Sequence, residues 1–115
     1  MVSNNTFRKL ALAFPETVEL PHFEKASFRV NKKIFATLLE KENLAMVKLN
    51  LVDQSVFFDL GKGAIFPVPG GWGKQGATYI HLKKVNPAIL KDALATAYKN
   101  TAPKKLVAYF ESTER

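Results

Sequence analysis

The sequence has no cysteine, only two histidines and no long hydrophobic run. Without cysteine there is no disulfide framework, no thiolate zinc site and no thiol catalysis, and the composition suits a reducing compartment. His22 shares a strand face with Glu24 alone, which is too few ligands for a closed zinc site. No segment approaches the roughly 20 apolar residues of a membrane span, and the N-terminus lacks the apolar centre of a signal peptide. We therefore expect a soluble cytoplasmic protein with no membrane partner, no bound metal and no cofactor.

Acidic residues are scarce in the second half of the chain. Residues 1–60 carry eight Lys or Arg against seven Asp or Glu, whereas residues 61–115 carry nine against three. Between Lys62 and Lys105, eight lysines accompany a single acid, Asp92. A bias of this kind concentrates polyanions and speeds their encounter with the protein, whatever the fold. Chance clustering of lysines on a soluble basic protein is the alternative, and charge alone does not decide between the two.

Hydrophobic periodicity and turn residues predict an α+β domain that spans residues 1–115. Asn86 is a suitable N-cap for the clearest helix, Pro15 ends the first helix, and Val56, Phe57 and Leu60 recur at helical spacing in the second. We expect helices at 5–14, 53–60, 87–99 and after Pro103, and strands at 17–23, 27–30, 33–39, 44–50, 64–68 and 77–84. This order favours an antiparallel sheet with helices packed on one face.

If helices cover one face of the sheet, the other face is open to solvent or to a partner. Strand alternation predicts that Arg29, Met46, Lys48, Tyr79, His81 and Lys83 point toward the open face. That set is basic and partly aromatic, as phosphate contact and base stacking both require. An ordinary solvated face is the alternative, and a register slip of one residue would move every side chain to the other side.

The only tryptophan lies in a glycine-rich segment, residues 67–76 (PVPGGWGKQG). Glycine amides can cradle an anion, but Val68 stands where a P-loop has its first glycine, and Gln75 follows Lys74 where Ser or Thr would hold magnesium. A strand rather than a helix is expected next, which also excludes a dinucleotide fingerprint. Nucleotide hydrolysis is therefore excluded. Trp72 either stacks on a base or folds back over the core, and both readings stay open.

No pattern of carboxylates, histidine and serine suggests a catalytic site, so we expect a protein that is not an enzyme. The leading hypothesis is a nucleic-acid-binding protein of low sequence specificity. Its candidate contact residues are Arg29, Lys32, Lys33, Trp72, Lys74, Tyr79, His81, Lys83 and Lys84. The alternative is a module that binds an acidic protein or a small ligand through the open sheet face or the Trp72 loop.

Several segments resemble the MmcQ/YjbR-like family. They are residues 14–16 (FPE), 28–36 (FRVNKKIFA), 72–82 (WGKQGATYIHL), 92–98 (DALATAY) and 102–106 (APKKL). The resemblance covers nearly the whole chain and implies a CyaY-like (frataxin-like) fold, with a double-wing type of DNA-binding architecture and no catalytic residues. Frataxins bind iron with an acidic ridge on their first helix. Residues 5–14 here contain no acid and carry Arg8 and Lys9, so iron binding is not expected.

Overall fold

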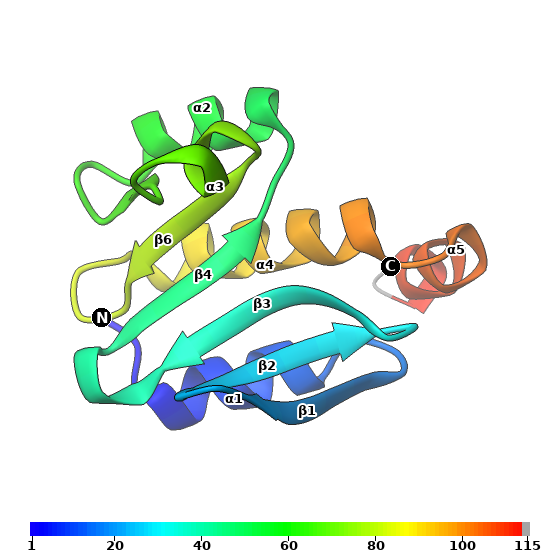
Figure 1. Ribbon diagram of the computed structural model, residues 1–115. Helices are drawn as coiled ribbons and strands as arrows, with labels where there is room; N and C mark the ends of the chain where they lie inside the picture. Colours follow the sequence, from blue (N-terminus) through cyan, green and yellow to red (C-terminus); the bar gives the residue numbers. More distant parts are fainter. Residues whose placement is uncertain (114–115) are drawn as a thin grey trace.

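The computed structural model describes residues 1–113 and has one six-stranded antiparallel sheet with helices on one face (Figure 1). The strand order is β1-β2-β3-β4-β6-β5. The strands are β1 (Thr17–His22), β2 (Lys25–Val30), β3 (Lys33–Leu39), β4 (Leu44–Lys48), β5 (Ile65–Pro67) and β6 (Ala77–His81). The helices are α1 (Asn4–Leu12), α2 (Leu51–Leu60), α3 (Gly71–Lys74), α4 (Pro87–Thr101), α5 (Lys104–Thr113) and the 3-10 turn η1 (Glu40–Glu42). The predicted fold class is confirmed.

Helices α1 and α4 lie behind the sheet in Figure 1, and the opposite face of β2, β3 and β4 carries no helix. The core between the two layers is rich in aromatic rings. Tyr98 of α4 is fully buried, stacks on Phe14 at 4.9 Å between centroids and meets Phe35 of β3 edge-on at 5.5 Å. Its hydroxyl donates a hydrogen bond of 2.8 Å to the carbonyl of Pro15, so a polar group is satisfied inside an apolar cluster.

Side-chain caps set the helix boundaries and correct several predicted ones. Ser3 caps α1 by accepting a hydrogen bond from the amide of Thr6, so this helix begins one residue earlier than predicted. Asn50 caps α2, so this helix begins two residues earlier than predicted and β4 ends at Lys48. Asn86 caps α4 as predicted, by accepting from the amides of Ala88 and Ile89.

The glycine-rich segment forms the one-turn helix α3, which periodicity did not predict. Close packing explains two of its glycines. A Cβ at Gly73 would lie 1.8 Å from the carbonyl oxygen of Val68, and one at Gly76 would lie 1.8 Å from that of Leu49. Gly76 also has φ +108°, which side-chain-bearing residues rarely adopt. These two glycines thus hold the segment tightly against its neighbours.

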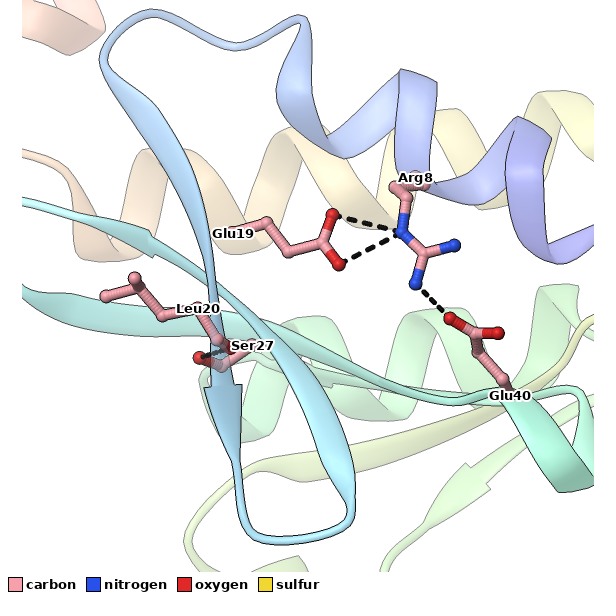
Figure 2. A network of polar contacts seen from close by, with 5 residues as sticks. All are labelled: Arg8, Glu19, Leu20, Ser27 and Glu40. Carbon is pink, nitrogen blue, oxygen red and sulfur yellow. Dashed lines mark hydrogen bonds and ion pairs between the residues drawn. The ribbon is translucent and has the colours of Figure 1, made fainter.

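Arg8 fastens α1 to the edge of the sheet (Figure 2). Its Nε donates to both carboxylate oxygens of Glu19 on β1 at 3.0 Å, and its Nη2 donates to Glu40 at the start of η1. The hydrogen bond to Glu40 is the main cause that raises the pKa of Arg8, against the opposing effect of desolvation. Two of the acids beside the first helix are therefore paired with a guanidinium. Across residues 1–113 no group of three or more His, Asp or Glu side chains is placed to hold a metal ion.

None of the helices in the described part of the chain is long and apolar enough to cross a membrane.

Candidate polyanion-binding surface

Four cationic side chains gather around an open hollow of about 420 Å³ at one end of the sheet. We call it the basic hollow. Its lining consists of Arg29, Lys32, Lys33, Ile34, Lys48, Asn100 and Thr101. Strands β2, β3 and β4 and the β2–β3 turn supply the four cations, and the C-terminal end of α4 supplies the two polar residues.

The β2–β3 turn presents the first three cations. Val30 pairs with Lys33, so Asn31 and Lys32 are the two residues of a tight turn, as the sequence predicts. Both have positive φ, +50° at Asn31 and +67° at Lys32. Asparagine tolerates this conformation, whereas lysine is strained in it by the clash of its Cβ with the backbone. A glycine would fit position 32 better, so the lysine is held there at some cost in stability.

A short chain of hydrogen bonds orients Arg29. Its Nε donates to the hydroxyl of Ser27 at 2.9 Å, and that hydroxyl donates to the carbonyl of Leu20 on β1 at 2.8 Å. Ser27 is fully buried, so this arrangement is fixed from below the surface. The guanidinium therefore keeps most of its donors for another partner.

No carboxylate lines the basic hollow, and none of the three ion pairs found among residues 1–113 involves its four cations. Asp53 accepts a hydrogen bond of 3.3 Å from Asn100, which is one of the lining residues. Helix C-termini attract cations through their dipole, which is the ordinary reason for a lysine here. Lys99 in the last turn of α4 already meets that need, and it pairs with Glu111 at 3.7 Å. The four cations of the hollow are thus in excess of what the helix end requires.

Trp72 and Lys74 lie near the same end of the sheet as the basic hollow. Lys48 pairs with Ala77, and the amide of Leu49 donates to the carbonyl of Gly76 at 3.1 Å, so α3 comes directly before the β6 end that adjoins Lys48. Trp72 is 69% exposed. The indole therefore does not belong to the core, and the alternative that it folds back over the domain is wrong.

The remaining predicted residues lie elsewhere. Tyr79 is in the middle of β6, while His81 pairs with Leu44 at the opposite end of the sheet. His81 lies four residue steps along the strand from Ala77, a distance of about 13 Å. Lys83 and Lys84 are exposed and follow His81, between Leu82 and Val85, whose carbonyls accept hydrogen bonds from Val2 and Met1. The structure thus places five of the nine predicted residues at one end of the sheet and three at the other, with Tyr79 between them.

The open face has the predicted alternation but not the predicted composition. A row of paired residues crosses all six strands: Leu20, Ser27, Thr37, Met46, Tyr79 and Phe66. Phe66 and Tyr79 meet edge-on at 5.8 Å between ring centroids. The central row of the expected basic face is therefore mixed and holds no cation, whereas Arg29 and Lys48 lie at the end that carries the basic hollow.

Sequence reasoning missed four of the residues that line the hollow: Ile34, Lys48, Asn100 and Thr101. Lys48 was placed on the open face but not among the contact residues, although its position at the end of a strand was a usable signal. No sequence signal indicated Asn100 and Thr101, because the packing of α4 across β3 and β4 brings them to the basic hollow from far along the chain.

Comparison with known proteins supports the fold and the family. None of the curated proteins searched matches the sequence. A solved structure, that of Deinococcus radiodurans protein DR2400 with its domain DUF419, has a TM-score of 0.76 and 16% sequence identity. The match covers 98% of this chain and 88% of that one, and at this identity it shows the fold alone.

The sequence model of the YjbR family matches residues 12–100. This range includes all six strands, the turn with Lys32 and the α3 segment. The match covers more than half of the chain and agrees with the resemblance found in the motifs. The chain therefore belongs to the YjbR family.

Proposed function

We propose that this protein is a non-enzymatic nucleic-acid-binding protein of low sequence specificity, and that the basic hollow makes its main phosphate contacts. One observation carries the proposal: four cations converge on a hollow to which residues 1–113 contribute no carboxylate. Cations that neutralise phosphates release condensed counterions, which supplies most of the affinity in non-specific binding. A surface of this kind fixes the position of a backbone without reading its bases.

The strained conformation at Lys32 supports a role in binding rather than in stability. Its φ of +67° is unfavourable for a side chain of this type, and the residue is exposed. An exposed lysine in such a position contributes little packing energy to the fold. Backbone strain that stability does not explain is common at binding sites.

The exposed indole of Trp72 favours nucleic acid over an acidic protein as the partner. Lys74 is on the same short helix and is also exposed, so an aromatic platform and a cation are available next to the end of β4 that carries Lys48. Stacking on a base is worth about 1–3 kcal/mol and tolerates any sequence. Alanine at Lys74 should weaken binding to every sequence alike.

The proposal is tested by fluorescence anisotropy of labelled single-stranded and duplex oligonucleotides with wild type and three single variants. We expect Lys33→Ala and Lys48→Ala to weaken binding to all sequences. Lys104→Ala removes the same charge from an exposed site on α5, outside the basic hollow, and is expected to change affinity much less. Equal losses in all three variants would mean that net charge alone causes binding and would refute the site.

Polyglutamate as a competitor separates the two partner classes. If polyglutamate displaces the oligonucleotide at matched charge concentration, the surface selects charge alone and an acidic protein becomes the better partner. We expect weak displacement, because polyglutamate offers no base to stack on Trp72.

Lys83 and Lys84 supply a test of how far the ligand extends. They lie at the other end of the sheet from the basic hollow, so only a ligand that spans the sheet reaches both. The double variant Lys83→Ala/Lys84→Ala is expected to weaken binding of long oligonucleotides and to leave short ones unaffected. His81 lies at that end as well, and Tyr79 lies between the two, so stacking on them belongs to the same long ligand.

A further inference from the structure

The sheet carries a pair of aromatic side chains outside the basic hollow. Phe66 of β5 lies directly opposite Tyr79 of β6, and their rings meet edge-on at 5.8 Å between centroids. Both side chains are partly exposed. We call these two residues the aromatic pair. The contact residues expected from the sequence include Tyr79 but not Phe66.

Neighbouring residues show which side of the sheet the aromatic pair faces. Thr78, next to Tyr79, is fully buried, and its hydroxyl accepts a hydrogen bond of 3.1 Å from Gln54 of α2. Ile65, next to Phe66, is fully buried as well. Successive residues of a strand point to opposite faces, so Tyr79 and Phe66 point away from the core and toward the open face.

The aromatic pair adjoins the basic hollow. Lys48, one of the four cations of the hollow, pairs with Ala77, and Met46 pairs with Tyr79. Lys48 and Tyr79 are therefore diagonal neighbours on the same face, about 7–8 Å apart along the backbone lattice of the sheet. A polymer whose backbone is held at Lys48 thus passes next to the aromatic pair.

The strands place no acidic side chain on the open face. Among the six strands, which all lie within residues 1–113, Glu19 is the one acidic residue. Its carboxylate accepts from Arg8 of α1, on the side of the sheet that the helices cover (Figure 2). A polyanion that crosses the open face therefore meets no strand carboxylate, and it reaches Arg29 and Lys48 at the basic hollow.

We propose that the ligand is a single-stranded nucleic acid whose backbone is held at the basic hollow and whose adjoining bases stack on Tyr79 and Phe66, an inference that rests on the proposed function. Paired bases in a duplex are stacked on one another, so a duplex presents base edges and backbone to a protein. The bases of a single strand offer their ring faces, and aromatic side chains on an exposed sheet are a recurring platform for them. The edge-on contact between Phe66 and Tyr79 keeps both rings in place, which lowers the ordering cost of binding.

Fluorescence anisotropy with a labelled single strand long enough to span the sheet, and with the duplex of the same sequence, tests the inference at physiological salt. Wild type is expected to bind the single strand more tightly than the duplex. Phe66→Leu and Tyr79→Leu should each weaken single-strand binding by about fivefold or more, as the loss of one stacked base requires, and leave duplex binding nearly unchanged. Tyr79→Phe keeps the ring and should bind as wild type does. Tyr109→Leu is the matched control, because it removes an exposed aromatic side chain on α5 and should change neither affinity.

A strand with abasic sites tests the same contacts from the side of the ligand and leaves the aromatic pair intact. The comparison is made in Trp72→Leu, where the exposed indole no longer contributes to stacking. This variant should bind the intact strand about fivefold or more tightly than the abasic strand, because the aromatic pair still stacks on bases. The two strands should show the same salt slope, since stacking releases no counterions.

Three outcomes overturn the inference and leave the proposed function standing, because binding persists in each. They are a wild type that binds the duplex as tightly as the single strand, equal affinity of Trp72→Leu for the intact and abasic strands, and equal losses of single-strand and duplex binding in Phe66→Leu. In the last case the aromatic pair supports the sheet and not the ligand. A wild type that binds neither form at low salt overturns the proposed function and the inference together.

Discussion

Replacement of Gln54 by leucine tests how α2 holds the α3 segment and Trp72 in place. Gln54 is 8% exposed, and leucine has nearly the same size without hydrogen-bonding groups. The substitution removes donors that reach the carbonyl of Gly73 at 2.9 Å, the carbonyl of Ala77 at 3.1 Å and the hydroxyl of Thr78 at 3.1 Å. Because the side-chain amide has two N–H groups, two of these three bonds can be strong at once.

The expected loss of stability depends on the hydrogen bonds that the three acceptors of Gln54 still make in the variant. The carbonyl of Gly73 still accepts from the amide of Gly76 at 3.0 Å, and that of Ala77 from the amide of Val68 at 3.0 Å. Thr78 still donates to the carbonyl of Gly76 at 2.9 Å. No acceptor is left wholly without a partner, so each lost bond costs about 0.5–1.5 kcal/mol rather than a full desolvation penalty. We expect Gln54→Leu to lower the free energy of unfolding by about 1–3 kcal/mol.

The assay is urea unfolding followed by both far-ultraviolet circular dichroism and Trp72 fluorescence. Gln75→Leu is the matched control, because Gln75 directly follows α3 and is exposed, so its replacement should change stability by less than about 0.5 kcal/mol. The native emission of Trp72 should also shift in Gln54→Leu, since α3 loses its tie to α2. Equal stability of the two variants would refute the role assigned to Gln54.

Three further predictions concern stability. Gly76→Ala should lower the free energy of unfolding by about 3 kcal/mol or more, because the added Cβ would meet the carbonyl of Leu49. Gly63 also has positive φ but no atom within 4 Å of an added Cβ, so Gly63→Ala should cost only about 1 kcal/mol, and similar losses for the two variants in thermal unfolding would contradict this prediction. Lys32→Gly should raise stability by up to about 1 kcal/mol and weaken oligonucleotide binding, and a loss of stability would show that the turn is not strained. Burial, and to a lesser extent the charge of Glu16, raises the pKa of Tyr98 above 10.0. The neutral phenol therefore stabilises the fold below pH 10, and this contribution declines as the pH rises above 10. Urea titrations at increasing pH should show this decline in wild type and not in Tyr98→Phe.

The fold was predictable because its signals are local. Alternation in the strands, the Asn86 cap and the tight turn at residues 31 and 32 each depend on neighbours in sequence, and all three are present in the structure. The same turn made Arg29, Lys32 and Lys33 predictable as a group.

The features of the structure that the sequence did not predict depend on contacts between segments that are distant along the chain. The side of α2 that faces inward is decided by the bonds of Gln54 to residues 19–24 positions away, and these prevail over the burial of Val56 and Leu60. Asn100 joins the basic hollow because α4 crosses the sheet. The glycine-rich segment was not predicted as a helix, and Gly73 is required by a close approach to Val68 that no local pattern reveals.

The most direct test of the account is the salt dependence of duplex DNA binding by wild type and by Lys33→Ala/Lys48→Ala, measured by anisotropy with Lys104→Ala/Lys105→Ala as the charge-matched control. The logarithm of the binding constant falls with the logarithm of salt concentration with a slope of about −0.9 for each phosphate neutralised. The account predicts that the slope of the hollow variant is less steep by about 1.8 and that the control keeps nearly the wild-type slope. Identical slopes in all three proteins, or no binding by wild type at low salt, would contradict the assignment of the basic hollow as a nucleic-acid site.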